Sequence, residues 1–250
     1  MKSLQVPGKR WLSMGVLSLM AWMAVMGLLA LAQEPPAVPQ STPDETQAIE
    51  NAQTLRDQRV PKARVSREKA IEMVQAAGWM QADAKGNFQS QRSLSRAELA
   101  TVLTKAFQLD SRKSGVEEVE SLKDVPANHW AAPSIETVMR LGIMKGYRPG
   151  YFYPNQHINR AEALSIMAQA YGVQQYDDET LDTILAPYSD AGQIPGWARK
   201  ALVTALKSGF IDVDDSGSLN PLKPMTRGDM AYALGQYLKR LEESTRPNLN

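Results

Sequence analysis

A threefold internal repeat constrains this chain more than any other feature of its sequence. Three glycines are each followed, 18 residues later and without a gap, by an arginine, and three further positions between them also correspond. The corresponding positions are Gly78, Gly142 and Gly209; Gly86, Gly150 and Gly217; Leu94, Ile158 and Met225; Ser95, Asn159 and Thr226; and Arg96, Arg160 and Arg227. Such self-similarity is typical of a tandem array of one structural unit.

Each unit has the pattern of a helix, a tight loop and a second helix. Apolar residues seven and four positions before the first glycine form one stripe on the first helix. The first glycine suits a left-handed helix stop, and the second suits a turn with positive φ. The second helix starts at a polar cap, and an acidic residue follows three positions later (Glu98, Glu162 or Asp229), which is the capping-box pattern.

One unit cannot bury its apolar stripe alone, whereas three units packed around a shared core can. We therefore expect an all-α fold of three helix–loop–helix repeats, packed as one pseudo-threefold helical domain that follows a signal peptide and a flexible linker. The repeats are expected at residues 65–110, where the pattern is degenerate, at 121–175 and at 185–240, with a polar tail at 241–250.

The start of the chain predicts export. Residues 1–32 combine basic residues, a charge-free run over 11–32 and a small-residue ending, which is the pattern of a signal peptide. The run is also long enough to span a bilayer, so a retained membrane anchor is the alternative. Residues 33–64 are rich in Pro and Gln and predict a flexible linker. Either reading places the protein in the cell envelope, in the periplasm or at the wall surface.

Composition argues against several kinds of site. The absence of cysteine excludes disulfides, thiolate metal sites and a thiol nucleophile. His129 and His157 are the only histidines, which argues against a multi-histidine metal centre. The 28 basic residues are balanced by 27 acidic ones without a basic block, so nucleic acid is not an expected partner. No metal or cofactor is implied. The repeats leave no segment for a catalytic domain, so we do not expect an enzyme.

The motifs resemble those of the S-layer homology family. The second unit matches nearly throughout, with Asp124-Val125, His129-Trp130-Ala131, Gly142-Ile143, Phe152-Tyr153-Pro154 and Asn159-Arg160-Ala161-Glu162. The third matches with Ser189-Asp190, Trp197-Ala198 and Thr226-Arg227-Gly228-Asp229, where Gly228 replaces the usual alanine. The first keeps its glycine pair and Ser95-Arg96-Ala97-Glu98, but Ser66 stands where the tryptophan would fall.

The resemblance implies a non-catalytic module that binds cell-wall polysaccharide, in many cases pyruvylated, or peptidoglycan itself. It further implies that the ligand lies in grooves between neighbouring repeats, where the motif arginine meets the acidic group of the ligand. Two functions from different classes follow. The first is a wall anchor for the chain itself or a partner, and the second is an adaptor whose repeats bind another envelope protein. A membrane is a partner only if the N-terminal segment is not cleaved.

The arginines are the strongest ligand candidates in the sequence. Arg96, Arg160 and Arg227 each occupy a first helical position, where a cation is mildly unfavourable beside the helix dipole. An arginine fork next to free helix N–H groups would instead make a good seat for a carboxylate. The alternative is an ion pair with an acidic residue of the neighbouring unit. We favour ligand contact, and both roles are compatible.

The remaining candidates have structural alternatives. Trp130 and Trp197 could stack on a sugar ring, but packing in the core is favoured slightly. Asp124 and Asp190 could accept sugar hydroxyls, and helix capping is favoured. The turns that begin at Gly142 and Gly209 could offer backbone donors. Capping explains Glu98, Glu162 and Asp229 better than a catalytic role, and both histidines are expected to be surface or packing residues.

Overall fold

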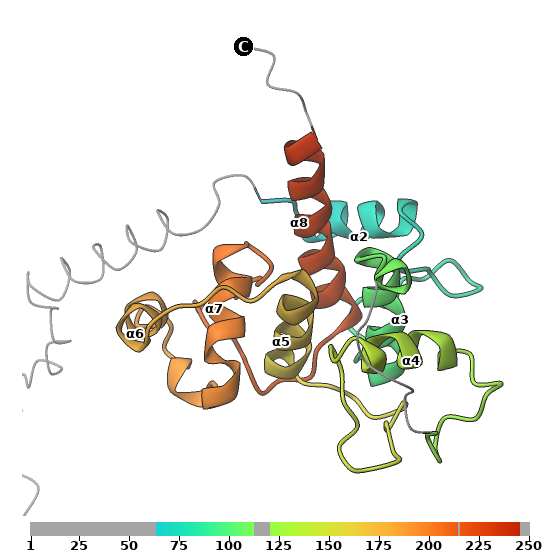
Figure 1. The fold of residues 1–250 in the computed structure, drawn as a ribbon. Helices are drawn as coiled ribbons and strands as arrows, with labels where there is room; N and C mark the ends of the chain where they lie inside the picture. The colour runs from blue at the N-terminus through green and yellow to red at the C-terminus, as the bar shows by residue number, and fades with distance from the viewer. Residues whose placement is uncertain (1–63, 113–120, 215, 246–250) are drawn as a thin grey trace, which may run out of the picture. The chain divides into compact units, whose positions relative to one another are not determined.

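The computed structural model describes residues 64–112, 121–214 and 216–245 (Figure 1). The predicted leader, and the predicted linker up to residue 63, lie outside the described residues. Within them the chain is helical and no strand is assigned, which confirms the all-α prediction. None of the described helices is both long and apolar enough to cross a bilayer.

Helices occur in pairs where the repeats were predicted. The α-helices are α2 (Arg67–Ala76), α3 (Arg96–Ala106), α4 (Ala132–Arg140), α5 (Arg160–Tyr171), α6 (Asp178–Leu185), α7 (Arg199–Lys207) and α8 (Arg227–Thr245). The short 3₁₀ helices are η1 (Leu109–Ser111), η2 (Ala191–Gln193) and η3 (Gly196–Ala198). We call α2–α3, α4–α5 and α7–α8, with the loop inside each pair, units 1, 2 and 3.

Two elements differ from the sequence expectation. Helix α6 lies between units 2 and 3, where no helix was predicted. Asp177 caps it by accepting the N–H of Thr180, and Leu181 and Leu185 are buried on its inner side. Helix α8 continues to Thr245, so its last turn includes residues that were assigned to the polar tail.

Local capping explains where the second helix of each unit begins. The hydroxyl of Ser95 accepts the N–H of Glu98, and the Glu98 carboxylate accepts the N–H of Ser95, so this capping box is complete. Thr226 and Asp229 make the same reciprocal pair. Asn159 accepts the N–H of Glu162, but the predicted return bond is wrong, because the Glu162 carboxylate pairs with Arg96 and the Tyr147 hydroxyl.

Both glycines of each unit have the predicted backbone conformation. The first glycines, Gly78, Gly142 and Gly209, have φ of +73°, +66° and +76° at the ends of the first helices. The second glycines, Gly86, Gly150 and Gly217, have φ of +83°, +72° and +73°. This left-handed region favours glycine, so the sequence pattern identified the turns correctly.

The three units contact one another in a closed cycle around one core. Helix α4 packs on α3, α7 packs on α5, and α2 packs on α8, so each first helix contacts the second helix of another unit (Figure 1). At the centre lie Leu94, Ile158 and Met225, which are buried. Leu94 N–H donates to Met225 O (2.8 Å), Met225 N–H to Ile158 O (2.8 Å) and Ile158 N–H to Leu94 O (3.3 Å). A threefold rotation between the units stays a prediction.

Candidate functional site

The repeated arginines lie where one unit contacts the next. We call the contact of Arg96 with the unit 2 loop junction 1, that of Arg160 with the unit 3 loop junction 2, and that of Arg227 with the unit 1 loop junction 3. In each junction the guanidinium donates to two loop carbonyls and pairs with the acidic residue at the start of the next second helix. The three sites therefore share one geometry.

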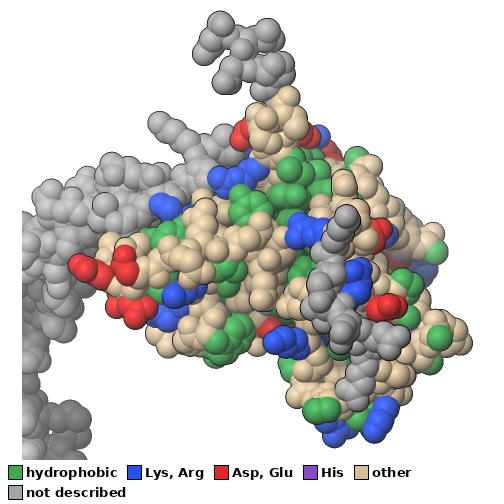
Figure 2. Space-filling view, in the orientation of Figure 1, with side chains coloured by type: hydrophobic (Ala, Val, Ile, Leu, Met, Phe, Trp, Pro, Cys, Tyr) green, Lys and Arg blue, Asp and Glu red, His purple; other side chains and the backbone are tan. Residues whose placement is uncertain are grey.

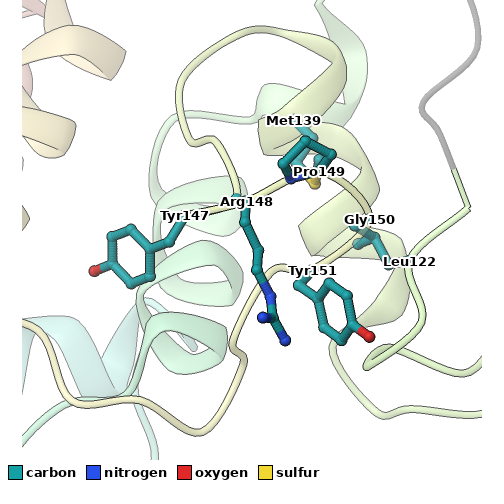
Figure 3. A pocket seen from close by; sticks show the side chains of 8 residues that line it. Leu122, Met139, Tyr147, Arg148, Pro149, Gly150 and Tyr151 are labelled. Carbon is teal, nitrogen blue, oxygen red and sulfur yellow. The ribbon is translucent and has the colours of Figure 1, made fainter.

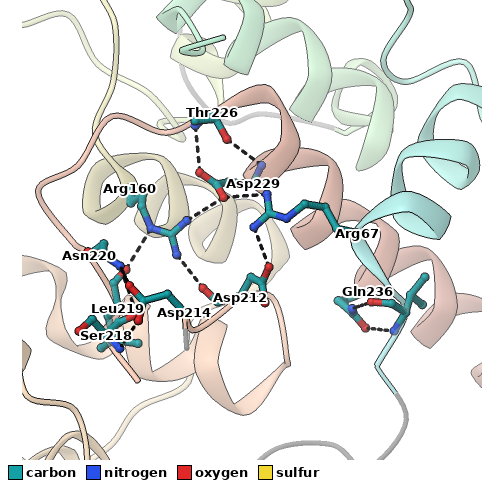
Figure 4. Close-up of polar contacts among 11 residues, drawn as sticks. Arg67, Arg160, Asp212, Asp214, Ser218, Leu219, Asn220, Thr226, Asp229 and Gln236 are labelled. Carbon is teal, nitrogen blue, oxygen red and sulfur yellow. Dashed lines mark hydrogen bonds and ion pairs between the residues drawn. The ribbon is translucent and has the colours of Figure 1, made fainter. Parts of the chain in front are cut away.

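The distances in the junctions show how closely this geometry is repeated. Arg96 Nε and Nη2 donate to Phe152 O (2.9 Å) and Lys145 O (2.6 Å), and Nη1 lies 3.0 Å from Glu162. Arg160 makes the corresponding contacts with Leu219 O (3.0 Å), Asp212 O (3.0 Å) and Asp229 (3.1 Å) (Figure 4). Arg227 makes them with Phe88 O (2.9 Å), Gln81 O (2.6 Å) and Glu98 (3.5 Å).

These contacts favour the ion-pair alternative for the arginines. The side chains of Arg96, Arg160 and Arg227 are 1%, 8% and 12% exposed, so they are largely withdrawn from solvent. An arginine with several buried charge-assisted hydrogen bonds holds the groups around it in place. Direct contact between these arginines and a ligand stays a prediction, and Arg227 is the most accessible of the three.

The expectation of free helix N–H groups beside the arginines is wrong. The first two N–H groups of α3, on Arg96 and Ala97, donate to carbonyls of the unit 2 loop at 3.0 and 2.9 Å. The first two N–H groups of α5 and of α8 donate to the loops of units 3 and 1 in the same way. Neighbouring backbone therefore satisfies the donors that an anion would otherwise use.

Junction 2 contains an additional arginine that the sequence analysis did not identify as a site residue. Arg67 lies 2.6 Å from Asp212 and 3.0 Å from Asp229, so Asp229 is paired with both Arg67 and Arg160 (Figure 4). Burial favours the neutral form of Asp229, but Arg160, Thr226 and Arg67 outweigh this effect and hold its pKa below the usual value. The two acids likewise hold the pKa of Arg67 above its usual value, although burial acts in the opposite direction.

The signal for Arg67 was a pair of departures from the repeat. Arg67 stands eleven residues before Gly78, where units 2 and 3 have Ala131 and Ala198. Gly228 stands where the other units have alanine, and a Cβ added there would lie 3.2 Å from Arg67 Nη1 and 3.0 Å from Ser90 O. The missing methyl group and the extra arginine therefore face each other.

Junction 3 is bordered by a small hollow. A cavity of about 150 Å³ is lined by residues of the unit 1 loop together with Arg92 and Arg227. Both guanidinium groups pair with Glu98. Burial favours the neutral form of Glu98, but hydrogen bonds from Arg92 and Ser95 outweigh this effect and hold its pKa below the usual value. Burial, followed by repulsion from Arg92, lowers the pKa of Arg227. This junction therefore brings two arginine side chains to the edge of one hollow.

Both candidate tryptophans are exposed, so the expectation that they pack in the core is wrong. Trp130 and Trp197 are 62% and 65% exposed. Each stands twelve residues before the first glycine of its unit, next to Ala131 or Ala198. Trp130 precedes α4, which packs on α3 of unit 1. Trp197 precedes α7, which packs on α5 of unit 2.

Asp124 and Asp190 have a structural role that was not predicted, and contact with sugar hydroxyls stays a prediction. Asp124 accepts the N–H groups of Phe152 (2.9 Å) and Tyr153 (2.7 Å). Asp190 accepts those of Leu219 (3.0 Å) and Asn220 (2.7 Å). The favoured capping role is therefore wrong for both, because each carboxylate clamps the backbone of the loop that receives a junction arginine.

The backbone donors predicted at Gly142 and Gly209 are also used within the chain. The N–H groups of Gly142, Ile143 and Met144 donate to carbonyls at the end of α4, and those of Gly209 and Phe210 donate to the end of α7. They close the first helices rather than face a ligand. His129 Nδ1 accepts the N–H of Ala131, and His157 is exposed, which agrees with their expected structural and surface roles.

Comparison with known proteins agrees with this reading of the repeats. The family model for the S-layer homology domain matches residues 121–164 and 187–231. The chain carries S-layer homology domains. The two matches fall on units 2 and 3. Membership of unit 1 in the family stays a prediction, which its glycine pair and the junction contacts of Arg96 and Arg227 support.

Relatives of these S-layer homology domains include proteins named for the cell surface or the cell wall. The chain is 30% identical over 178 residues to a surface-layer 125 kDa protein of Lysinibacillus sphaericus, covering 70% of this chain and 14% of that protein. It is 24% identical over 155 residues to a cellulosome-anchoring protein of Acetivibrio thermocellus, covering 62% and 34%. It is 36% identical over 101 residues to an uncharacterized cell wall amidase of Bacillus anthracis, covering 40% and 18%. The chain thus spans about a third or less of the length of each.

Proposed function

We propose that this protein is a non-catalytic envelope component that attaches itself or a partner to the cell wall by binding an acidic wall polysaccharide. The observation that carries the proposal is the exposure of Trp130 and Trp197 at corresponding positions of two S-layer homology domains. An exposed tryptophan presents a large rigid surface together with one N–H donor, which suits contact with the flat face of a sugar. The relatives include a surface-layer protein and a cellulosome-anchoring protein, which supports attachment to the wall.

In this proposal the polymer contacts junctions 1 and 3. Trp197 and Trp130 are the stacking residues, and Arg92 and Arg227 face the acidic substituent at the hollow of junction 3. The buried arginines Arg96 and Arg160 act as positioning residues that hold the loops and helix starts in register. Junction 2 lacks a tryptophan and is filled by Arg67, so we assign it no polymer contact.

Co-sedimentation with isolated wall sacculi tests the proposal. The full-length chain, kept soluble with a non-ionic detergent, is mixed with sacculi that retain their polymer, with sacculi after mild acid removal of ketal groups, and with sacculi stripped of polymer. We expect binding to the first and a loss with the others, together with weaker binding at higher ionic strength. Absence of co-sedimentation with untreated sacculi would refute the function. Binding that survives removal of the polymer would assign recognition to peptidoglycan instead.

The adaptor function makes a different prediction. In that case an envelope protein would bind the repeats in the absence of sacculi. Added wall polymer would not displace it. The matches to proteins whose names include anchoring and surface layers favour the wall over this alternative.

A further inference from the structure

The loop of unit 2 carries a cluster of aromatic and basic side chains. We call residues 145–153 the aromatic loop. Its three tyrosines are close together, with ring centroids 5.8 Å apart for Tyr147 and Tyr153 and 6.0 Å apart for Tyr151 and Tyr153. The guanidinium carbon of Arg148 lies 4.1 Å from the ring centroid of Tyr151 and 5.5 Å from that of Tyr153. Figure 3 shows Arg148 extending between Tyr147 and Tyr151.

The corresponding loops of units 1 and 3 hold the same turn with short polar side chains. Tyr147 corresponds to Asp83 and Asp214, Tyr151 to Asn87 and Ser218, and Tyr153 to Gln89 and Asn220. Asp83 accepts the N–H groups of Lys85 and Asn87, both at 2.9 Å. Asp214 accepts the N–H of Ser218 at 2.9 Å. Since these loops receive junction arginines without an aromatic cluster, neither the turn nor the junction requires the tyrosines.

One of the tyrosines lies in an unfavourable backbone conformation. Tyr153 has φ of +62°, and its counterparts Gln89 and Asn220 have +56° and +52°. A bulky side chain is disfavoured in the left-handed region, whereas asparagine tolerates it well. Unit 2 therefore keeps a tyrosine at a position where a small polar residue would be easier to accommodate. Such a departure from local preference is a reason to look for a binding role.

The aromatic loop borders a shallow apolar hollow. A cavity of about 330 Å³ is lined by Leu122, Met139, Gly146, Tyr147, Arg148, Pro149, Gly150 and Tyr151. Tyr147 is 48% exposed, and Arg148, Lys145 and Lys123 are exposed. In the space-filling view, basic and hydrophobic side chains lie next to one another at the lower edge of the described residues (Figure 2). Apolar ring faces beside cations suit a sugar that carries an acidic group.

We propose that the aromatic loop is an additional carbohydrate contact, which stacks a sugar ring on its tyrosines and pairs an acidic substituent with Arg148 and Lys123. This inference rests on the proposed function and adds a contact outside the junction arginines. Tyr147 connects the two regions, because its ring lies 4.2 Å from the guanidinium carbon of Arg96 and its hydroxyl donates to Glu162 at 2.6 Å. A polymer in junction 1 would meet the loop next, and a second contact on one polymer raises retention through effective concentration.

A loop exchange within the chain tests this proposal. The variant Tyr147→Asp, Arg148→Ala, Tyr151→Asn and Tyr153→Gln gives unit 2 the side chains of the unit 1 loop, which the chain itself shows to be compatible with the turn. We expect about tenfold weaker binding to sacculi that retain their polymer, because the variant loses one cation–aromatic contact surface. The melting temperature should change little. Arg148→Ala with Tyr151→Ala is the smaller variant, and it should weaken binding about fivefold if the exchange does not fold.

The control is Ser216→Ala with Ser218→Ala in the unit 3 loop, which should leave binding unchanged. Wild-type binding together with undiminished binding of the folded exchange variant would overturn the role of the aromatic loop and leave the wall function standing. A wild-type chain that does not bind sacculi would overturn both. Undiminished wall binding with loss of a co-purifying envelope protein would assign the loop to a protein contact and would also overturn the proposal.

Discussion

Junctions 1 and 2 have the same arginine contacts but differ in the residues around the arginine. In junction 1 Arg96 is covered by the rings of Tyr147 and Phe152, and Glu162 is bonded to Arg96 and the Tyr147 hydroxyl. In junction 2 Arg160 shares Asp229 with a second arginine, Arg67. The repeated geometry holds the units together in both junctions. The residues that vary around it distinguish a surface that can meet a polymer from one that is closed by an internal ion-pair network.

Replacing the junction arginines should have the largest effect on stability, and the effect should be larger in junction 1 than in junction 2. Arg96→Ala leaves Glu162 without its cation, and we expect a loss of about 4 kcal/mol in the free energy of unfolding. Arg160→Ala should cost about 3 kcal/mol, because Asp229 keeps Arg67. Urea denaturation measures both, with the exposed Arg148→Ala as control. Unchanged stability of both variants would mean that the arginines do not hold the units together.

The shared carboxylate of junction 2 should make stability depend on pH. The pKa of Asp229 is lower in the folded than in the unfolded chain, so its contribution is complete above the unfolded pKa of about 4 and is lost as the pH falls through the folded value. Asp229→Asn should cost about 2 kcal/mol at pH 7 and flatten the decline below about pH 5. Denaturation at pH 7 and at pH 3 gives the comparison. An equally steep decline in the variant would contradict the pairing.

Giving unit 1 the Trp-Ala pair that precedes the first helix in units 2 and 3 should make junction 2 able to bind polymer. The variant Ser66→Trp with Arg67→Ala should lose about 2 kcal/mol of stability. About half comes from the ion pairs of Arg67, which is 32% exposed, and half from the Ser66 hydroxyl, which caps α2 by accepting the N–H of Lys69. It should also bind polymer-bearing sacculi more strongly than wild type. Arg67→Ala alone is the control and should not gain binding. If the double variant binds no better, filling by Arg67 is not what closes junction 2.

The smallest expected effect concerns the space beneath Arg67. Gly228→Ala should cost about 1 kcal/mol, because the new methyl group would crowd Arg67 Nη1 and Ser90 O. In the Arg67→Ala background the cost should fall by about 0.5 kcal/mol, because the contact with Arg67 is gone while those with Ser90 remain. A thermal double-mutant cycle measures this coupling. Strict additivity would show that the glycine and the arginine are independent departures.

Local patterns in the sequence predicted most of the fold. The glycine spacing, the caps and the apolar stripes identified three helix pairs, since each depends on residues near one another in the chain. Helix α6 was missed because its acidic residues obscured the buried pair Leu181 and Leu185. The reciprocal capping bond of Glu162 failed because a residue of another unit, Arg96, competes for the carboxylate.

The site was harder to predict because its contacts join units that are distant in sequence. Arg160 was identified as a candidate from its position in the repeat, but its partners Leu219, Asp212 and Asp229 are recognisable only once the units are packed. The same holds for Asp124, whose acceptor role depends on where the unit 2 loop returns. Exposure of Trp130 was undecidable from the sequence, because the same residue suits a core or a surface.

The most direct test of the account is the binding of Trp130→Ala with Trp197→Ala to polymer-bearing sacculi. The central claim is that these exposed rings contact the polymer while the buried arginines hold the units together. Loss of two stacking residues should weaken co-sedimentation at least tenfold, about 1.4 kcal/mol or more, with an unchanged melting temperature. Leu241→Ala, which removes an exposed apolar side chain near the end of α8, should bind like wild type. Undiminished binding of the folded double-tryptophan variant would contradict the account.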